Sequence, residues 1–184
     1  MVWGLILGIG IPIIIIIIFI YYFNKFVVLE NRIENSSAQI DVQLKKRGDL
    51  VPSLVKVVKS YAKFEKDVLT EVTQARTQMI SGKNLAEKVK AGDKLQNALK
   101  SIFAVAENYP QLRANENYMH LQTELSAIED KVAYARQYYN DAVLDLDNTS
   151  SKLPGVMFFK LYGRQKKDYL KIPSVSREMP EIDL

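Results

Sequence analysis

Cysteine is absent from this sequence, and histidine occurs once, at His120. Without cysteine the chain can form no disulfide, perform no thiolate chemistry and carry no lipoprotein acyl group. A single histidine with no HExxH context cannot build a zinc site by itself. The sequence also has no glycine-rich phosphate loop, no GxSxG motif and no recognisable pair of catalytic acids. We therefore expect no enzyme activity, no catalytic or metal-binding residue and no cofactor.

Charged side chains are missing from the start of the chain, MVWGLILGIGIPIIIIIIFIYYFN, and the first one is Lys25. About 20 apolar residues are what a helix needs to cross about 30 Å of hydrocarbon. A cleaved signal peptide is the alternative, but it would have a positive n-region and a small-x-small cleavage site, and neither is present. Trp3, Tyr21 and Tyr22 lie at the two ends of the run, where aromatic rings prefer the headgroup level. Residues 1–23 are predicted to be an uncleaved transmembrane anchor.

Basic residues follow the anchor but do not precede it, with Lys25 and Arg32 close to its end and Lys45-Lys46-Arg47 further on. Basic flanks are retained on the cytoplasmic side. This favours a single-pass protein of the cell membrane with its N-terminus outside and its C-terminal body in the cytoplasm, by a modest margin because Glu30 and Glu34 accompany these charges. The net charge of +4 is mild for this length, so nucleic acid is not an expected partner.

The rest of the chain has helical periodicity almost throughout, without β-type alternation. The last stripe, from Tyr118 to Leu146, steps by three and four for roughly four heptads, which is typical of a left-handed coiled coil. Gly92-Asp93 is a possible break in the preceding segment. The predicted core positions are Phe26, Leu29, Ile33, Ile40 and Leu44; Leu54, Val58, Tyr61, Val68, Val72, Ala75 and Met79; Leu85, Val89, Leu95, Leu99, Ile102, Val105 and Ala106; and Tyr118, Leu121, Leu125, Ile128, Val132, Ala135, Tyr139, Ala142 and Leu146.

The stretch QIDVQLKKRGDLVPSLV, Gln39 to Val55, combines an amphipathic pattern with residues that break helices. Asp49 is a good N-cap, Pro52 then falls in the first turn of a helix, and Gly48 suits a helix end. Lys45-Lys46-Arg47 would complement the dipole at that end. We expect one helix to end near Arg47 and another to start near Leu50, which gives four soluble helices. The alternative is a single helix kinked at Pro52, which would leave three.

The same stretch carries a family resemblance. Together with AVAENYPQLRANENYMHLQTEL (Ala104 to Leu125), YARQYYND (Tyr134 to Asp141) and LPG (Leu153 to Gly155), it resembles the signature blocks of the LemA family of bacterial and archaeal membrane proteins. The likeness runs from the anchor to about Tyr169, and the tail from about Lys171 falls outside it. The resemblance implies a single N-terminal anchor and an antiparallel helical bundle, and it implies no assigned enzymatic activity.

The predicted fold is all-α, with an N-terminal transmembrane helix followed by an antiparallel up-and-down helical bundle. The domains are the anchor, 1–23, the bundle, 24–153, and an aromatic and basic segment with a tail, 154–184.

The block ANENYMHLQ reads as a helix start, with a partner-binding turn as the alternative. The segment after Pro154 suits either a lid over the bundle end or an interfacial anchor on anionic lipid. Candidate partner or lipid contacts are Asn115, Glu116, Asn117, Glu129, Arg136, Asn140, Phe158, Phe159, Tyr162 and Arg164.

Three functions agree with these patterns, and all involve the lipid bilayer as a partner. The first is a non-enzymatic anchored bundle that presents a cytoplasmic surface to a membrane or cytoplasmic protein, as a scaffold or accessory of a membrane machine. The second is a structural membrane protein that forms homo-oligomers to organise or deform the bilayer. The third is a small-ligand sensor that uses the polar edge at Glu129, Arg136 and Asn140, although such groups more often fix the register of a bundle.

Overall fold

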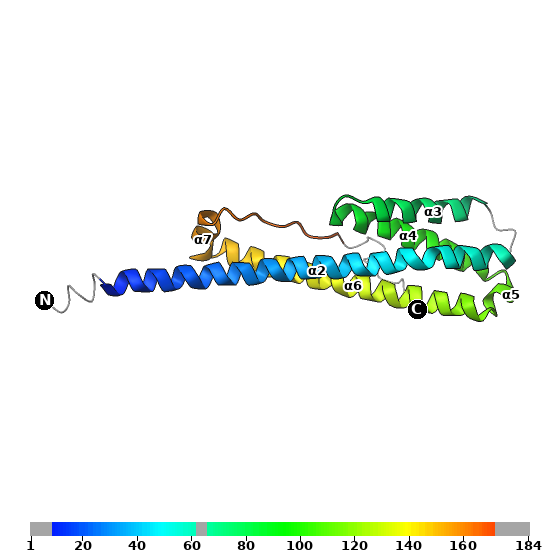
Figure 1. Cartoon of the computed structure of the whole chain (residues 1–184), viewed down its shortest axis with the longest axis horizontal. Helices are drawn as coiled ribbons and strands as arrows, with labels where there is room; N and C mark the ends of the chain where they lie inside the picture. The colour runs from blue at the N-terminus through cyan, green and yellow to red at the C-terminus, as the bar shows by residue number, and fades with distance from the viewer. Residues whose placement is uncertain (1–8, 62–65, 172–184) are drawn as a thin grey trace, which may run out of the picture. The chain divides into compact units, whose positions relative to one another are not determined.

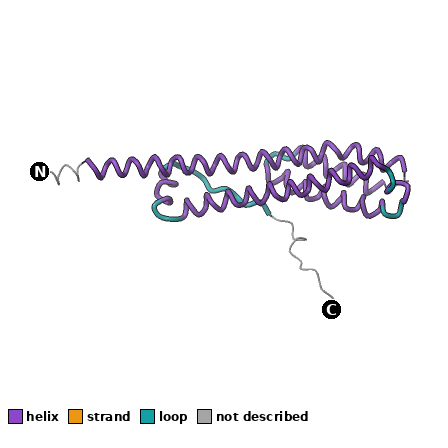
Figure 2. Tube along the Cα trace, turned by 90° about the horizontal axis from the view of Figure 1, so that it is seen from below, coloured by secondary structure: helices purple, strands orange, loops and turns teal. Residues whose placement is uncertain are grey.

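A computed structural model of the chain describes residues 9–61 and 66–171. Within these ranges the chain is all-α, with helices and loops and no strand (Figures 1 and 2). The helices are α2 (Ile11–Tyr61), α3 (Lys66–Ser81), α4 (Leu85–Ala106), α5 (Pro110–Arg113), α6 (Glu116–Ser151) and α7 (Gly155–Leu161). The predicted fold class is therefore confirmed at the level of helix content.

The described residues form two compact units, and each is assembled from parts that are distant in the sequence. The terminal unit combines the residues up to Ser36 with Gln137–Tyr169, and the central unit consists mainly of Ser37–Arg136. Helices α2 and α6 contribute residues to both units.

The first part of α2 carries the apolar run. It is the one helix in the described ranges that is long and apolar enough to cross a membrane. The large apolar side chains from Ile11 to Ile20 are all exposed, by between 37% and 60%, so the rest of the described chain leaves most of their surface uncovered. Such a surface is expected where lipid is the solvent. Trp3 and the rest of the first eight residues lie outside the described part of the chain.

The predicted turn at Gly48 to Pro52 is wrong, because α2 continues through it to Tyr61. Proline has no N–H to donate to the carbonyl four residues earlier. In this structure Arg76 Nε of α3 donates to that carbonyl, Gly48 O, at 2.6 Å. A Cβ at position 48 would lie only 3.0 Å from Met79 Cε, so glycine lets α3 come close. Gly48 and Pro52, which indicated a turn, instead lie where α2 packs against α3.

Helix α3 is an element separate from α2 in the described residues, so the unbroken α2 does not by itself leave three soluble helices. Gly92-Asp93 is not a break either, since α4 runs through it. A Cβ at Gly92 would lie 2.8 Å from Leu44 Cδ2, and glycine therefore permits the close packing of α2 and α4.

The predicted stripes form the core of the described residues, with four exceptions. Every predicted position of the α6 stripe is buried, from Tyr118 through Leu146. The exceptions are Tyr61, which is exposed, and Val68, Leu85 and Val105, which are half-buried. Tyr61 is the last residue of α2, and its hydroxyl accepts a hydrogen bond from Asn115 Nδ2 at 2.9 Å. Its side chain thus joins two helix ends instead of filling the core.

Candidate functional site

A cluster of charged side chains lies inside the central unit, where α2, α4 and α6 meet. Arg47 of α2 is 1% exposed and Arg136 of α6 is 7% exposed. Arg136 Nη2 donates to Asp93 Oδ1 at 2.5 Å and to the Val89 carbonyl at 3.5 Å, while Arg47 Nη1 donates to the Gly92 carbonyl at 3.4 Å. Two arginines from different helices therefore converge on one turn of α4.

The electrostatics of this cluster are set by burial. Burial lowers the pKa of the Arg47 guanidinium, nearby Arg136 lowers it further, and Glu129 and Asp93 oppose the change. Two cations in a confined space need two anions beside them, because an unpaired buried charge is strongly destabilising. The cluster of Arg47, Asp93, Glu129 and Arg136 is close to neutral as a whole. This arrangement fixes the register of three helices, since sliding one of them would separate the charges.

Only part of this cluster could be predicted from the sequence. Glu129 and Arg136 were predicted as a polar edge, whereas Arg47 was expected at the end of a helix with Lys45 and Lys46, and Gly92-Asp93 at a possible break. Both expectations are wrong, because α2 continues through Arg47, which is buried, and α4 continues through Asp93. The sequence did contain a signal that Arg47 is buried. Leu44, Arg47 and Val51 are spaced three and four positions apart, which places Arg47 on the apolar side of α2. Asn140 is half-buried on α6 in the terminal unit, and a ligand role for it stays a prediction.

The start of α6 has the capping residue that the sequence predicts. Asn115 Oδ1 accepts a hydrogen bond from Tyr118 N at 3.0 Å, which satisfies one of the unpaired amides at a helix start. Glu116 and Asn117 occupy the first turn and are exposed, and the acid there suits the helix dipole. The helix start is confirmed, and a partner contact at these three residues stays a prediction.

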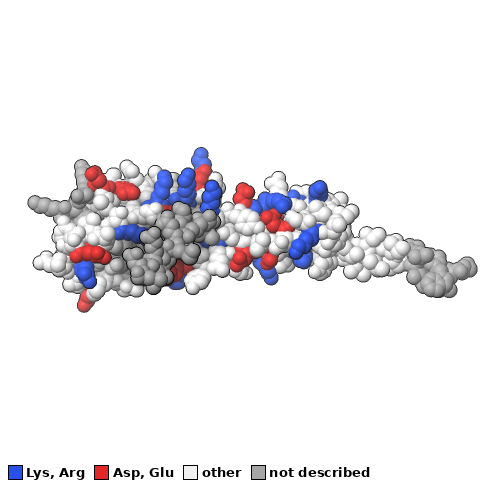
Figure 3. Space-filling view, turned by 180° about the vertical axis from the view of Figure 1, so that it is seen from behind, with Lys and Arg blue, Asp and Glu red and all other residues white. Residues whose placement is uncertain are grey.

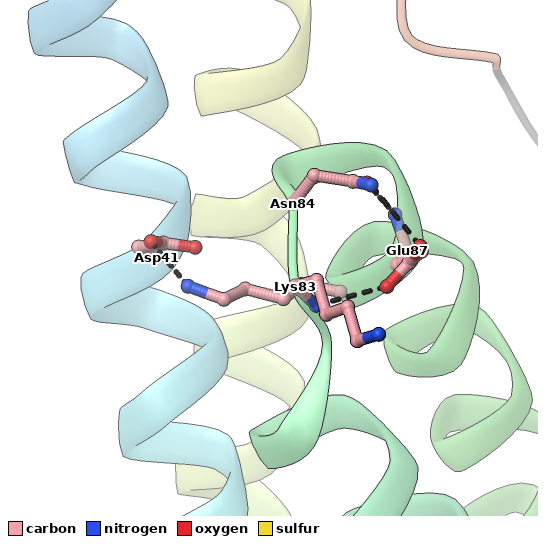
Figure 4. A network of polar contacts seen from close by, with 5 residues as sticks. Asp41, Lys83, Asn84 and Glu87 are labelled. Carbon is pink, nitrogen blue, oxygen red and sulfur yellow. Dashed lines mark hydrogen bonds and ion pairs between the residues drawn. The ribbon is translucent and has the colours of Figure 1, made fainter.

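A groove of about 320 Å³ opens on the central unit between α2, α3 and the start of α4. Its walls are Asp41, Val42, Leu44, Lys45, Asp49, Met79, Ile80 and Lys88. Lys88 Nζ pairs with Asp41 Oδ2 at 2.7 Å, whereas the buried Asp41 Oδ1 has no hydrogen-bond partner. Beside it, Asn84 caps α4 by accepting from Glu87 N at 2.9 Å, and Glu87 Oε2 accepts from Lys83 N (Figure 4). Capping thus fixes the rim of the groove.

In the terminal unit, α7 packs on the part of α2 where the apolar run ends. The Phe159 side chain is buried with its ring 5.3 Å from that of Phe26, and Phe158 stacks on Tyr22 at 5.2 Å. The Tyr162 hydroxyl donates to the Phe19 carbonyl at 2.8 Å. Three predicted contact residues of the aromatic segment therefore face α2.

Arg164 completes this contact with a charged group. Its guanidinium pairs with Glu30 of α2 and lies over the Phe23 ring, 5.4 Å from the centroid. Cation–π and ionic contacts together hold the chain that follows α7 against α2.

Metal chemistry finds no support in the part of the chain that the structure describes, where no three His, Asp or Glu side chains are grouped to hold an ion. Lysines and arginines alternate with acids on the face shown in Figure 3. The described residues thus define an all-α protein with one helix long and apolar enough to cross a membrane, an internal charge cluster and a surface groove.

A profile of the LemA family matches residues 36–184, and the chain belongs to this family. The match begins after the apolar run and extends past Lys171, so the family pattern includes the tail that the quoted motifs left out. The family accounts for a membrane-associated helical protein of unassigned function.

Curated relatives are similar at low identity. Magnetosome protein MamQ 2 of Paramagnetospirillum magneticum is 24% identical over 175 residues, which cover 81% of this chain and 64% of that protein. MamQ of Magnetospirillum gryphiswaldense is 21% identical over 173 residues, covering 80% and 64%. Protein LemA of Metamycoplasma hominis is 28% identical over 131 residues, covering 66% and 58%. The chain thus spans less than two thirds of the length of these relatives.

Proposed function

We propose that this protein is a non-enzymatic membrane-anchored scaffold, whose helical bundle presents a cytoplasmic surface to a protein partner. The observation that carries the proposal is the continuity of α2. One helix contains the exposed apolar run, from Ile11 to Ile20, and the buried core stripe of the central unit. Anchor and bundle therefore both include residues of α2. In this proposal α2, α3, α4 and α6 form an up-and-down bundle in the cytoplasm, and the N-terminus of the chain lies outside the cell.

The groove of the central unit is the surface we propose for the partner. Val42 and Ile80 are half-exposed apolar side chains on its walls, and Asp41 and Lys88 supply charges at its edge. An apolar centre with a polar rim is the anatomy of protein interfaces. A groove between helices also suits an amphipathic helix that lays its apolar face into it. We therefore propose a helical segment of another membrane or cytoplasmic protein as the partner.

Photocrosslinking in intact membranes tests this surface. A photoreactive amino acid at Ile80 is expected to give adducts of distinct higher mass, and the same group at Lys131, an exposed site on α6, is the matched control. Adducts at multiples of the chain's own mass would instead support the second candidate, a self-associating structural protein. If Ile80 gives no adduct beyond the Lys131 background, the groove is not a docking surface.

The orientation of the chain in the membrane has a separate test. A C-terminal reporter that is active only in the cytoplasm should be active, because the basic residues Lys25 and Arg32 follow the apolar run and favour the cytoplasmic side. Activity of a reporter that works only outside would refute this orientation and leave the anchor itself untouched.

A further inference from the structure

The outer face of α7 is apolar and exposed. Its inner face buries Gly155 and Phe159 against the rest of the terminal unit. The outer face carries Met157 and Leu161, exposed by 65% and 69%, and Leu153 just before the helix is 78% exposed. Met157 and Leu161 lie four positions apart in α7 and therefore share one side of it, and Leu153 adds a third exposed apolar side chain in the turn before the helix. A contiguous apolar face of this kind marks an interaction surface.

Lipid is the occupant that the surrounding contacts favour. Tyr162 and Phe158, on the other side of α7, contact Phe19 through a hydrogen bond and an edge-on ring contact at 6.2 Å. Phe19 belongs to the exposed apolar run of α2. The outer face of α7 therefore continues the surface that crosses the membrane, within one compact unit. A protein partner on the outer face of α7 would also have to displace the lipid that surrounds the apolar run of α2.

The position of Phe19 along α2 gives an approximate depth for α7 in the membrane. Phe19 precedes Lys25, the first charged residue, by six positions, which is about 9 Å along a helix at about 1.5 Å per residue. Helices that lie in the membrane interface bury their apolar face by roughly 5–10 Å. A cationic side chain accompanies this apolar face, because Lys160 is exposed on α7. The contacts of α7 thus place it at the depth that such helices occupy.

We propose that α7 is an interfacial helix, which lies in the boundary between headgroups and acyl chains with Leu153, Met157 and Leu161 toward the lipid. The proposal rests on the membrane anchoring proposed above and adds a second lipid contact to it. It also reassigns the lipid-facing residues, since Phe158 and Phe159 face α2. The ion pair between Arg164 and Glu30 keeps α7 beside the anchor, so the C-terminal segment is held at the membrane surface.

Fluorescence quenching by lipid tests this, and the cysteine-free sequence makes single labels simple to introduce. The full chain carries Met157→Cys or Leu161→Cys with an environment-sensitive fluorophore and is reconstituted in phosphatidylcholine vesicles. These vesicles contain lipids with quenchers at graded depths. Ile16→Cys is the control inside the apolar run, and Lys131→Cys is the control in the central unit. All four side chains are exposed, so the substitutions leave the core intact.

Shallow quenchers are expected to quench the labels at Met157 and Leu161 most, deep quenchers the label at Ile16, and neither the label at Lys131. Labels on α7 that behave like Lys131 while Ile16 is quenched would overturn the interfacial helix and leave the anchor standing. An unquenched Ile16 would overturn the anchor and this proposal together. Disulfide linkage of two chains through Met157→Cys without lipid quenching would assign the face to a second copy and also refute it.

Discussion

Substitution of Arg76 tests the account of Pro52 inside α2. Arg76→Ala removes the donor that lies 2.6 Å from Gly48 O, and the carbonyl then has neither that donor nor an amide at Pro52. A hydrogen bond that involves a charged group contributes about 1.5–3 kcal/mol, so the free energy of unfolding should fall by about that amount. Gln74→Ala, an exposed change on the same helix, should stay within about 0.5 kcal/mol.

The decisive measurement is the coupling between Arg76 and Pro52. In a Pro52→Ala background, the new N–H can bond to Gly48 O, and the loss of Arg76 should then cost about 1–2 kcal/mol less than it does in the parent. Denaturant unfolding of the full chain in detergent, followed by circular dichroism, gives the four free energies of the cycle. An equal cost of Arg76→Ala in both backgrounds would mean that Arg76 acts through packing or charge and not through this carbonyl.

Two further predictions concern the core, and the same unfolding assay checks both. Asp93→Ala should lower the free energy of unfolding by about 3–5 kcal/mol because it leaves Arg136 buried without its partner. Changing both Asp93 and Arg136 to leucine should recover part of this loss. No recovery would contradict a charge-based origin of the loss. Leu125→Ala should cost about 2–5 kcal/mol, with Lys131→Glu nearly neutral, and the reverse order would mean that the α6 stripe is misassigned.

Periodicity predicted what depends on single helices. The stripe from Tyr118 to Leu146 is buried as expected, because an amphipathic helix turns its apolar side toward the protein core. Features that depend on a second helix were missed. Pro52 was predicted to start a helix, since the group that compensates it, Arg76, lies 28 positions from Gly48 along the chain. A local motif carries no information about such a partner.

The same limit explains the charge cluster. Arg47 was expected at the end of a helix with Lys45 and Lys46, yet its charged neighbours inside the central unit come from α4 and α6. The aromatic segment after Pro154 was identified by composition, whereas the side of α7 that faces α2 could be read only from contacts. Phe159 was one of the candidate partner or lipid contacts, and its side chain is buried with its ring 5.3 Å from that of Phe26.

The sequence distance across the terminal unit has a consequence during synthesis. Arg164 pairs with Glu30 across 134 positions, and Tyr162 bonds to Phe19 across 143. At about 5–20 residues per second, a ribosome needs roughly 7 to 30 s to pass from Glu30 to Arg164. Helices α3 and α4, adjacent in sequence, can pair long before this. Phe26 therefore emerges from the ribosome well before the Phe159 ring that packs against it, and the terminal unit cannot be completed until nearly all of the described chain has been made.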